Sequence, residues 1–508
     1  MGGHFGAPHL ILLWNFVRRS FYQDSVTLMR LTREMEAVPG VHRAAAMMAT
    51  SENKELLAAA GLLATDGEHA APADLIVAVA AENEAAAREA GARAERALST
   101  TRPTAEGGGS SPRTLERALA RLSGANLAIV SVPGRYAGAE AMRALRAGLH
   151  VMLFSDNVPL ETEVALKQVA LERGLLMMGP DCGTAILDGT PLGFANEVPR
   201  GRIGLAAASG TGLQEVSVLL AARGEGVSQA IGLGGRDLSD AVGGAMALRA
   251  LDLLAGDPAT AVVCLIGKPP GPATTARLVE RCARLGKPCV ACFPGASASG
   301  FSWTTATLED AAHAATALAR GTRPAPVEFT SPEDAARAAK NAASALTPAQ
   351  RFVRGVYSGG TLAYEALGIL GSRLDGVTPT LAGDGPGHRV VDLGDDRFTF
   401  GRPHPMIDSS LRREWIVREA TDPATAVVLV DLVLGYGAHP DPAADLAPAL
   451  TSARAARPGL AIVASVTGTD ADPQNRPRQI AGLRAAGAIV MPSNAQAARL
   501  AALIVGRQ

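Results

Sequence analysis

Short, strongly apolar runs alternate with helix-length segments through most of this chain. Runs such as 127–132, 150–154 and 203–207 carry apolar residues at consecutive positions, whereas a strand with one side in water carries them at every second position. Strands that are buried on both faces and separated by helices predict parallel sheets with helices on either side. The sequence therefore predicts an α/β protein.

The length of the chain requires more than one hydrophobic core. Its 508 residues are 47% hydrophobic and 19% charged, and a single core serves about 100–200 residues, so three or four domains are expected. The Gly/Ser stretch at 107–112 marks the clearest boundary. The predicted segments are an N-terminal α/β domain 1–100, a Gly/Ser linker 101–114, α/β domains 115–199 and 200–325, a helical connector 326–345 and a last domain 346–508.

Two sequence patterns recur in the same order. The run Asp-Pro-Ala-Thr-Ala-Val-Val occurs at 257–263 and again at 422–428, each time as a turn that feeds an apolar strand. Upstream, the segment 209–215 returns more loosely at 358–365, with a longer gap before the second pattern. Ordered matches predict that the domains 200–325 and 346–508 are duplicates, with an insertion in the later copy.

The net charge of the chain limits the classes of binding partner to be expected. The chain has 48 Lys plus Arg against 49 Asp plus Glu, and this net charge of −1 gives no basic field for nucleic acid or a membrane surface. The expected partner is a small molecule or another protein. Near-neutral charge on a hydrophobic chain also predicts self-association. The apolar run 10–17 is too short to span a bilayer, and we expect it to be either a frayed start or the product of an over-called initiation codon.

The cysteines indicate a reducing compartment. An odd number of five, spread through a large chain, is not a disulfide framework, so a cytoplasmic location is predicted. Cys289 and Cys292 have metal-ligand spacing, but they lie in an apolar run that reads as a strand, where residues three apart face opposite sides. The sequence therefore predicts no metal site.

A glycine-rich turn between a strand and a helix is the strongest candidate for binding. Ser209, Gly210, Thr211 and Gly212 follow the strand 203–207 and precede a helix. Such a turn presents free backbone N–H groups and the positive end of the helix to an anion. The alternative is that a tight turn simply needs glycine. Recurrence of the pattern favours binding at both copies, and the second copy contributes Ser358, Gly359, Gly360 and Thr361.

Other polar residues follow strands whose carboxyl ends share one sheet edge, where ligands of parallel sheets collect. Arg236 and Lys268 would add cations for an anionic substrate, although a lone cation after a strand is usually only solvated. Asn and Asp are also ordinary turn formers. The candidates at this edge are Ser155, Asn157, Gly179, Asp181, Arg236 and Lys268.

A loop in the last domain is the candidate catalytic segment. Arg402, His404 and Asp408 lie in a stretch stiffened by two prolines, and rigid polar loops with mixed chemistry are typical of functional sites. Together with Lys268 they form the predicted catalytic set. The alternative is that His404 is an idle surface histidine.

These motifs carry a family resemblance. The run 127–270 resembles the α subunit of succinyl-CoA synthetase, with Gly179-Pro-Asp-Cys182 and Ser209-Gly-Thr211 at that family's Gly-Pro-Asn-Cys and Ser-Gly-Thr motifs. This resemblance implies tandem Rossmann-like or flavodoxin-like domains, a CoA-binding-like segment at 115–199 and a duplicated ligase-type domain. The whole chain also resembles the FdrA family, through motifs at 21–26, 47–50, 154–158, 232–238 and 401–408.

The departures from the synthetase affect the expected chemistry. Its phosphorylated histidine belongs to a Gly-His-Ala loop, whereas the matching loop 295–300 here has no histidine, and Lys268 stands in place of a supporting glutamate. The glycine loop that binds CoA has no counterpart at 21–26. A phosphohistidine relay is therefore not expected, and no cofactor is predicted, with CoA and a nucleotide left as open alternatives.

The FdrA resemblance implies a function. It implies one subunit of a multi-subunit oxamate carbamoyltransferase in allantoin (purine) degradation, which transfers a carbamoyl group between oxamate and phosphate. The implied ligands are the anions carbamoyl phosphate, phosphate and oxamate, and the implied partners are other subunits of the complex. Two alternatives stay open: a subunit of an ADP-forming acyl-CoA synthetase, and a non-catalytic metabolite-binding subunit.

Overall fold

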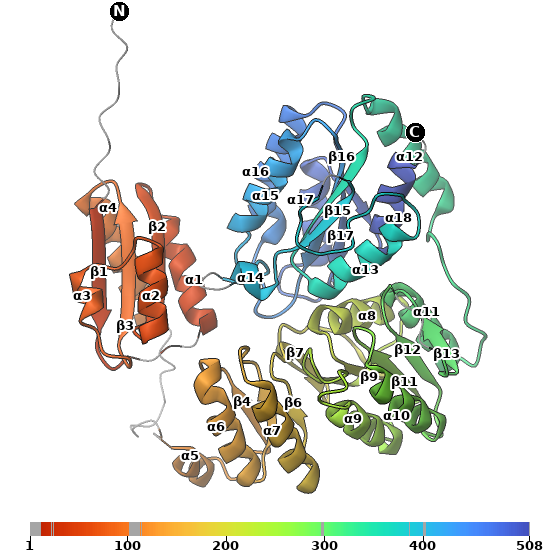
Figure 1. The fold of residues 1–508 in the computed structure, drawn as a ribbon, viewed down its shortest axis with the longest axis horizontal. Helices are drawn as coiled ribbons and strands as arrows, with labels where there is room; N and C mark the ends of the chain where they lie inside the picture. Colours follow the sequence, from red (N-terminus) through yellow and green to blue (C-terminus); the bar gives the residue numbers. More distant parts are fainter. Residues whose placement is uncertain are drawn as a thin grey trace, which may run out of the picture. The chain divides into compact units, whose positions relative to one another are not determined.

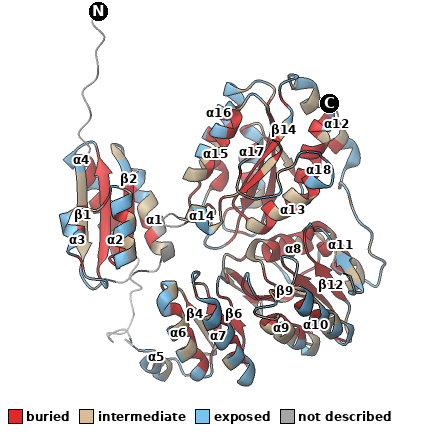
Figure 2. Cartoon of the chain, viewed as in Figure 1, coloured by how far each residue is buried: buried red, intermediate tan, exposed pale blue. Residues whose placement is uncertain are grey.

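A computed structural model describes residues 12–21, 23, 25–100, 112, 114–295, 299–385, 387–399 and 403–506 (Figure 1). The described chain falls into two compact units, one ending at Arg121 and one that holds residues 122–399 and 404–506. Figure 2 shows buried residues concentrated in the inner strands of the larger sheets and exposed residues mainly on the helices.

The first unit is a small antiparallel α/β domain. Its sheet has the order β1-β3-β2, and every residue of the central strand β3 is buried. Residues 12–17 of the apolar run predicted to be a frayed start belong instead to strand β1, which pairs with β3 along its whole length. Buried Asn15 holds it in place, because its amide donates to Leu62 O at 2.8 Å and accepts from Ala64 N at 2.8 Å. The elements are β1 (Leu12–Arg18), α1 (Ser25–Glu36), β2 (Val41–Met48), α2 (Ser51–Ala59), α3 (Thr65–Glu68), β3 (Leu75–Ala81), α4 (Glu84–Thr100) and α5 (Leu115–Arg121).

The second unit begins with a three-stranded parallel sheet of order β4-β5-β6. Its helix α6 has buried residues at Ala137, Ala141, Ala144 and Leu145, which is the spacing of one helix face. The elements are β4 (Leu127–Val130), α6 (Gly134–Arg146), β5 (His150–Leu153), α7 (Leu160–Glu172) and β6 (Met177–Met178).

A seven-stranded sheet follows, with the order β13-β12-β11-β9-β10-β7-β8. The hairpin β7-β8 pairs antiparallel with β10, so the boundary predicted at 199/200 falls inside this sheet. The remaining strands run parallel. The elements are β7 (Thr184–Leu187), β8 (Thr190–Gly193), β9 (Arg200–Ala207), α8 (Gly210–Ala222), β10 (Val227–Gly232), α9 (Ala245–Gly256), β11 (Val262–Ile266), α10 (Pro272–Ala283), β12 (Cys289–Cys292), β13 (Trp303–Thr305) and α11 (Leu308–Ala319).

The last sheet is parallel, with the order β15-β14-β16-β17-β18. Helix α12 (Pro332–Ala345), in the predicted connector, precedes it and buries Ala335 and Ala339 in the shared core. The further elements are β14 (Phe352–Tyr357), α13 (Gly360–Gly371), β15 (Arg389–Asp392), α14 (Asp396–Thr399), α15 (Ser410–Thr421), β16 (Thr425–Val433), α16 (Pro442–Ala456), β17 (Ala461–Thr467), α17 (Arg476–Ala485), β18 (Ile489–Met491) and α18 (Asn494–Val505).

The two larger sheets share one topology. In β9–β13 and in β14–β18 alike, the first strand lies between the second and the third, and the fourth and fifth follow outward. The repeated Asp-Pro-Ala-Thr turn precedes the third strand in each copy, and the insertion of the later copy lies between α13 and β15. The predicted α/β fold with a duplicated domain is confirmed.

Candidate functional site

The two glycine turns of the duplicated domains meet. Ser209 at the start of α8 and Thr361 in the first turn of α13 share a hydrogen bond of 2.5 Å between their hydroxyl oxygens. The domains are joined behind this contact by one continuous hydrophobic core. Buried Glu215 of α8 accepts from Asn494 N, and buried Glu365 of α13 accepts from Leu308 N, so each helix caps the last helix of the other domain. This reciprocal capping fixes the two helix starts against each other.

The α8 turn is capped by a hydroxyl group. Ser209 is the N-cap residue, and its hydroxyl accepts from Gly212 N at 2.9 Å. The first N–H groups of a helix have no partner within the helix, and Gly210 and Thr211 occupy these positions in α8. The first turn holds no acidic residue, and Thr184 Oγ1 lies 3.2 Å from where a Cβ on Gly210 would be. Hydroxyls and N–H groups therefore surround this helix end.

The α13 turn is instead braced by a buried carboxylate. Asp431 accepts from Ser358 N at 2.8 Å, from Ser358 Oγ at 2.9 Å and from Gly359 N at 2.8 Å. Arg412 neutralises this carboxylate through a contact of 2.9 Å, and both side chains are buried. The prediction that Ser358 and Gly359 bind a ligand is therefore revised, since Asp431 already holds their donors.

A second carboxylate lies beside the α13 turn. Asp392 Oδ2 is 2.6 Å from where a Cβ on Gly360 would be, so only glycine fits there. Burial raises the pKa of Asp392 to about 7, with nearby Asp431 acting in the same direction and Lys268 and the Gly394 N–H group opposing it. This carboxyl group changes charge in the neutral range, close to the meeting point of the two helices.

His404 lies next to this carboxyl group. The Met406 N–H donates to His404 Nδ1 at 3.2 Å, which makes Nδ1 the acceptor and places the ring proton on Nε2. Burial, followed by the charge of Arg412, lowers the pKa of His404 to about 4, so the ring is neutral at physiological pH. Nε2 is 2.8 Å from where a Cβ on Gly394 would be. His404 is thus a neutral hydrogen-bond donor at the edge of the site.

The Asp408 side chain is used at the start of a helix. Its carboxylate accepts from Ser410 N at 2.7 Å, at the start of α15. Asp237 makes the matching contacts in the first copy, where it accepts from the first N–H groups of α9. The predicted catalytic role of Asp408 is therefore replaced by a helix-capping role. Arg402, also predicted to be catalytic, lies outside the described residues.

The Arg236 guanidinium group is also occupied by partners within the protein. It donates to Glu163 Oε2 at 2.8 Å and to Val158 O at 2.7 Å. Glu163 in turn pairs with buried Lys167, which contacts Asp237 at 2.8 Å. This network ties α7 to the seven-stranded sheet, so the predicted anion-binding role of Arg236 is corrected to a structural one.

The remaining predicted residues lie after β5 and β6. Ser155 is buried, and its hydroxyl accepts from Val132 N at 3.0 Å, whereas Asn157 is exposed with a positive φ of 52°. Gly179 has a φ of 105°, and a Cβ there would lie 2.3 Å from Leu153 O, so its glycine is required by the backbone. All three therefore have a structural reason for their identity.

Asp181 and Lys268 carry charges that act on each other near these strand ends, and Lys268 also acts on Asp392 beside the α13 turn. Desolvation raises the pKa of Asp181 to about 6, with Asp156 and Asp396 adding to the shift, while Arg236 and Lys268 oppose it. Lys268 is exposed and acts on the pKa of both Asp181 and Asp392. It is therefore a cation whose charge acts on Asp181, which precedes β7, and on Asp392, which ends β15.

Sequence reasoning missed Thr184, Asp392 and Asp431 as parts of the site. Asp431 lies inside a strand that is buried at every position, so only its burial beside Arg412 shows its role. Asp392 ends a strand at the same edge as the turns, and that position was a usable signal. Thr184 belongs to the hairpin β7-β8, which lies before the boundary predicted at 199/200 but pairs with β10 after it.

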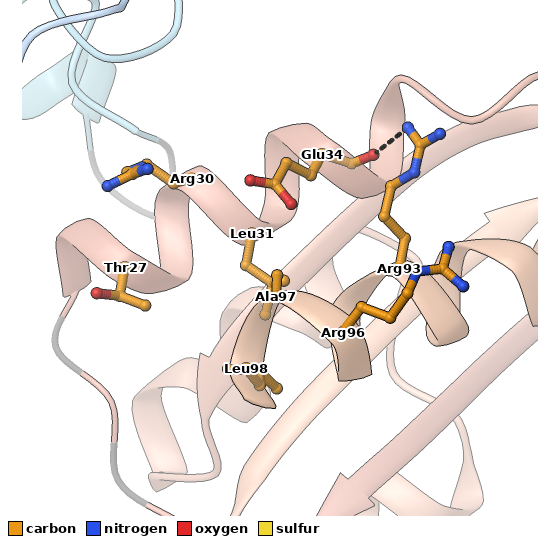
Figure 3. A pocket seen from close by; sticks show the side chains of 8 residues that line it. All are labelled: Thr27, Arg30, Leu31, Glu34, Arg93, Arg96, Ala97 and Leu98. Carbon is orange, nitrogen blue, oxygen red and sulfur yellow. Dashed lines mark hydrogen bonds between the residues drawn. The ribbon is translucent and has the colours of Figure 1, made fainter. Parts of the chain in front are cut away.

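The first unit contains a cavity lined by residues of two helices. It has a volume of about 600 Å³ and lies between α1 and α4 (Figure 3). Arg93 donates to Glu34 O at 3.2 Å, and Arg96 pairs with Glu89 at 2.8 Å. Both guanidinium groups are thus engaged within the unit.

Two stretches of the chain match known families. Residues 356–504 match the CoA-ligase family, and residues 12–114 match the AllF heavy metal-associated domain. The α2 subunit of the mitochondrial ADP-forming succinate–CoA ligase of Trichomonas vaginalis is 31% identical over 149 residues, which is 28% of this chain and 47% of that subunit. Fold and match together define the class as an α/β protein with a CoA-ligase domain similar to those of ADP-forming acyl-CoA synthetases.

One relative matches nearly the full length. The uncharacterized protein YahF of Escherichia coli (strain K12) is 38% identical over 506 residues, covering 96% of this chain and 97% of YahF. The chain belongs to the YahF family. Among solved structures, acetyl-coenzyme A synthetase 1 of Ca. Korarchaeum cryptofilum aligns with 75% of this chain and 82% of its own, at 15% identity and a TM-score of 0.30, which is too low to support a functional argument.

The prediction of a carbamoyltransferase is wrong. The family match over 356–504 is to CoA ligases, and a further relative is the ADP-forming sulfoacetate–CoA ligase subunit SauD of Bilophila wadsworthia, 29% identical over 151 residues, 28% of this chain and 50% of SauD. Turns that hold phosphate or carboxylate suit both chemistries, so the motifs alone could not separate a transferase from a ligase.

The described residues offer neither a candidate membrane helix nor a candidate metal site. Within the described ranges, no helix combines the length and apolarity needed to cross a membrane. The same residues contain no group of three or more His, Cys, Asp or Glu side chains placed to hold a metal ion. The segment 12–114 has no cysteine in its sequence, so it offers no thiolate to a heavy metal.

Proposed function

We propose that the chain is a subunit of an ADP-forming acyl-CoA ligase and that the α8 turn holds the phosphate or carboxylate group of the reacting molecule. The observation that carries the proposal is the 2.5 Å contact between Ser209 and Thr361, which joins a helix start from each duplicated domain. The CoA-ligase match over 356–504 and the ADP-forming relatives support the reaction class.

Each group in the site has a task in this reaction. Forming an acyl-CoA from a carboxylate needs an activated acyl group, and an acyl phosphate is the anion that activation by ATP supplies. The N–H groups of Gly210 and Thr211 would hold its phosphoryl oxygens at the positive end of α8. His404 Nε2–H would donate to the acyl oxygen, on which negative charge grows during attack by the thiol. Lys268 would balance the remaining charge.

The phosphoryl group is not carried on the loop 295–300, because that stretch has no histidine. His404 is a poor substitute, since a nitrogen that bears the ring proton has no lone pair to attack phosphorus. We therefore propose that the phosphoryl group stays on the substrate and that a partner subunit supplies the nucleotide site.

Two wider proposals accompany this one. The motifs at 154–158, 232–238 and 401–408 support membership of the FdrA family, and the AllF match of residues 12–114 is in line with the allantoin-related role that this membership implies. A cytoplasmic location is supported by the five free thiols. The anionic ligand, the partner subunits and self-association are likewise proposals.

The test is ATP- and CoA-dependent thioester formation. The chain is assayed alone and together with the proteins encoded beside its gene, over a panel of short carboxylic acids, with hydroxylamine to trap activated acyl groups. We expect product only when a partner is present, and no acid-labile phosphate on this chain. Absence of thioester and hydroxamate with every partner would reject the ligase proposal.

A further inference from the structure

Two cysteines far from the candidate site lie close enough to form a disulfide. Cys282 is in the last turn of α10, and Cys289 begins β12. The Cys289 thiol donates a hydrogen bond to the sulfur of Cys282, with 3.1 Å between the two Sγ atoms. A disulfide bond is about 2.0 Å long, so side-chain rotation has to close a gap of about 1 Å.

The two sulfurs differ in reactivity. The hydrogen bond from Cys289, with the nearby charge of Arg281, lowers the pKa of Cys282, whereas the pKa of Cys289 is raised by the same hydrogen bond and by burial. Burial alone raises the pKa of Cys264 to about 12. Because the thiolate is the nucleophile, Cys282 is the reactive member of the pair and Cys289 its resolving partner.

A cavity gives small reagents access to this pair. It has a volume of about 300 Å³, and both cysteines line it together with Lys287, Phe301 and Trp303. Cys282 is half-buried, while Cys289 is only 5% exposed. A small oxidant therefore meets Cys282 first and finds Cys289 directly behind it.

We propose that Cys282 and Cys289 form a reversible disulfide site that hydrogen peroxide oxidises. The Cys282 thiolate attacks one peroxide oxygen, the O–O bond breaks, and the leaving hydroxide takes up a proton to become water. The Cys289 sulfur then attacks the sulfur of the Cys282 sulfenic acid, the S–O bond breaks, and the hydroxyl leaves as a second water with the Cys289 proton. The two thiols lose two electrons, peroxide gains them, and thiol exchange reverses the reaction.

The oxidised site ties two elements together. The new bond links the C-terminal end of α10 to the start of β12 and closes a short loop that contains Lys287. A covalent link of this kind restricts the unfolded chain, so the oxidised protein should unfold at a higher temperature than the reduced one.

Peptide mapping of the purified full-length chain tests the proposal. The protein is treated with hydrogen peroxide, its free thiols are blocked, and trypsin cuts after Arg281 and Arg284, which places Cys282 and Cys289 in separate peptides. We expect a disulfide-linked pair of these peptides that separates on reduction. Cys282→Ser and Cys289→Ser should each abolish the pair, and the control Cys264→Ser should keep it.

A rate measurement makes the result independent of any folding defect. In the untreated protein, a maleimide should modify Cys282 faster than the other cysteines, and Cys289→Ala should slow this reaction because the hydrogen bond donated to Cys282 is lost. Oxidation of Cys282 to the sulfinic acid without a linked peptide, or a link to another cysteine, would overturn the proposal.

Discussion

The α8 and α13 turns come from the same position of duplicated domains, yet they are built differently. The α8 turn is capped by its own Ser209, whose hydroxyl accepts from Gly212 N at 2.9 Å. The α13 turn is held by Asp431, which takes three of its donors, and Asp392 lies beside Gly360. At the start of α13 carboxylates of the protein lie close to the turn, whereas the cap of α8 is the Ser209 hydroxyl.

This difference shows that a sequence motif does not by itself determine whether a turn binds a ligand or a side chain of the same protein. Both turns have free N–H groups by local geometry, so both favour negative charge. In the second copy a buried carboxylate supplies that charge and gains stability, and Arg412 balances it. Duplication has therefore given two turns with the same local motif and different surroundings.

The largest expected effect is a loss of stability when the α13 turn loses the Asp431 carboxylate. Asp431→Ala leaves Arg412 buried without its partner, and breaking a buried ion pair costs about 3–5 kcal/mol. Urea unfolding followed by circular dichroism measures this loss. The control Glu140→Ala removes one partner of an exposed pair with Arg143 and should cost less than about 1 kcal/mol. A stable Asp431 variant would remove the distinction between the turns.

The second-largest expected effect is on the affinity of the α8 turn for phosphate. Gly210→Val places methyl groups where the ligand must lie and crowds Thr184, so affinity for phosphate should fall at least about tenfold, or about 1.4 kcal/mol. Calorimetric titration measures the affinity. Gly371→Val, at the far end of α13 where a Cβ meets no atom within 4 Å, should bind as the parent does. Equal binding by a folded Gly210 variant would make the α8 turn purely structural.

A pH series sharpens the comparison further. Below its pKa of about 7 Asp392 is neutral, and above it the carboxylate repels a bound anion. Affinity for sulfate, whose own charge is constant in this range, should therefore fall as pH rises through 7, by roughly fivefold or about 1 kcal/mol. Asp392→Asn should flatten the profile. A fall that persists in this variant would assign the effect to another group.

The smallest effect concerns Lys268. Because its side chain is exposed, Lys268→Ala should weaken phosphate binding about threefold at low salt and less at physiological ionic strength, where charges are screened within about 8 Å. Titrations across a salt series measure this. Lys340→Ala removes an equal charge from α12, which contributes no residue to the site, and serves as the control. An equal loss at all salt concentrations would mean that Lys268 acts by contact and not by its field.

Much of the architecture could be predicted because it follows from local patterns. Consecutive apolar residues indicated strands such as β9 and β16, and the repeated Asp-Pro-Ala-Thr turn identified two copies of one domain. The failures involve pairing between distant segments. Neither the strand β1 nor the hairpin β7-β8 could be assigned to its sheet without its partner, because strand pairing is a long-range contact.

For the site, the sequence by itself determined where the glycine turns lie, since a strand, a tight turn and a helix are encoded within a few residues of each other. It did not determine which donors stay free. Tertiary structure decided that Asp431 reaches the α13 turn across 73 residues, that Arg236 is paired with Glu163, and that Asp408 caps α15. The reason is physical: a charged group binds a ligand only if no closer partner satisfies it, and that partner comes from elsewhere in the chain.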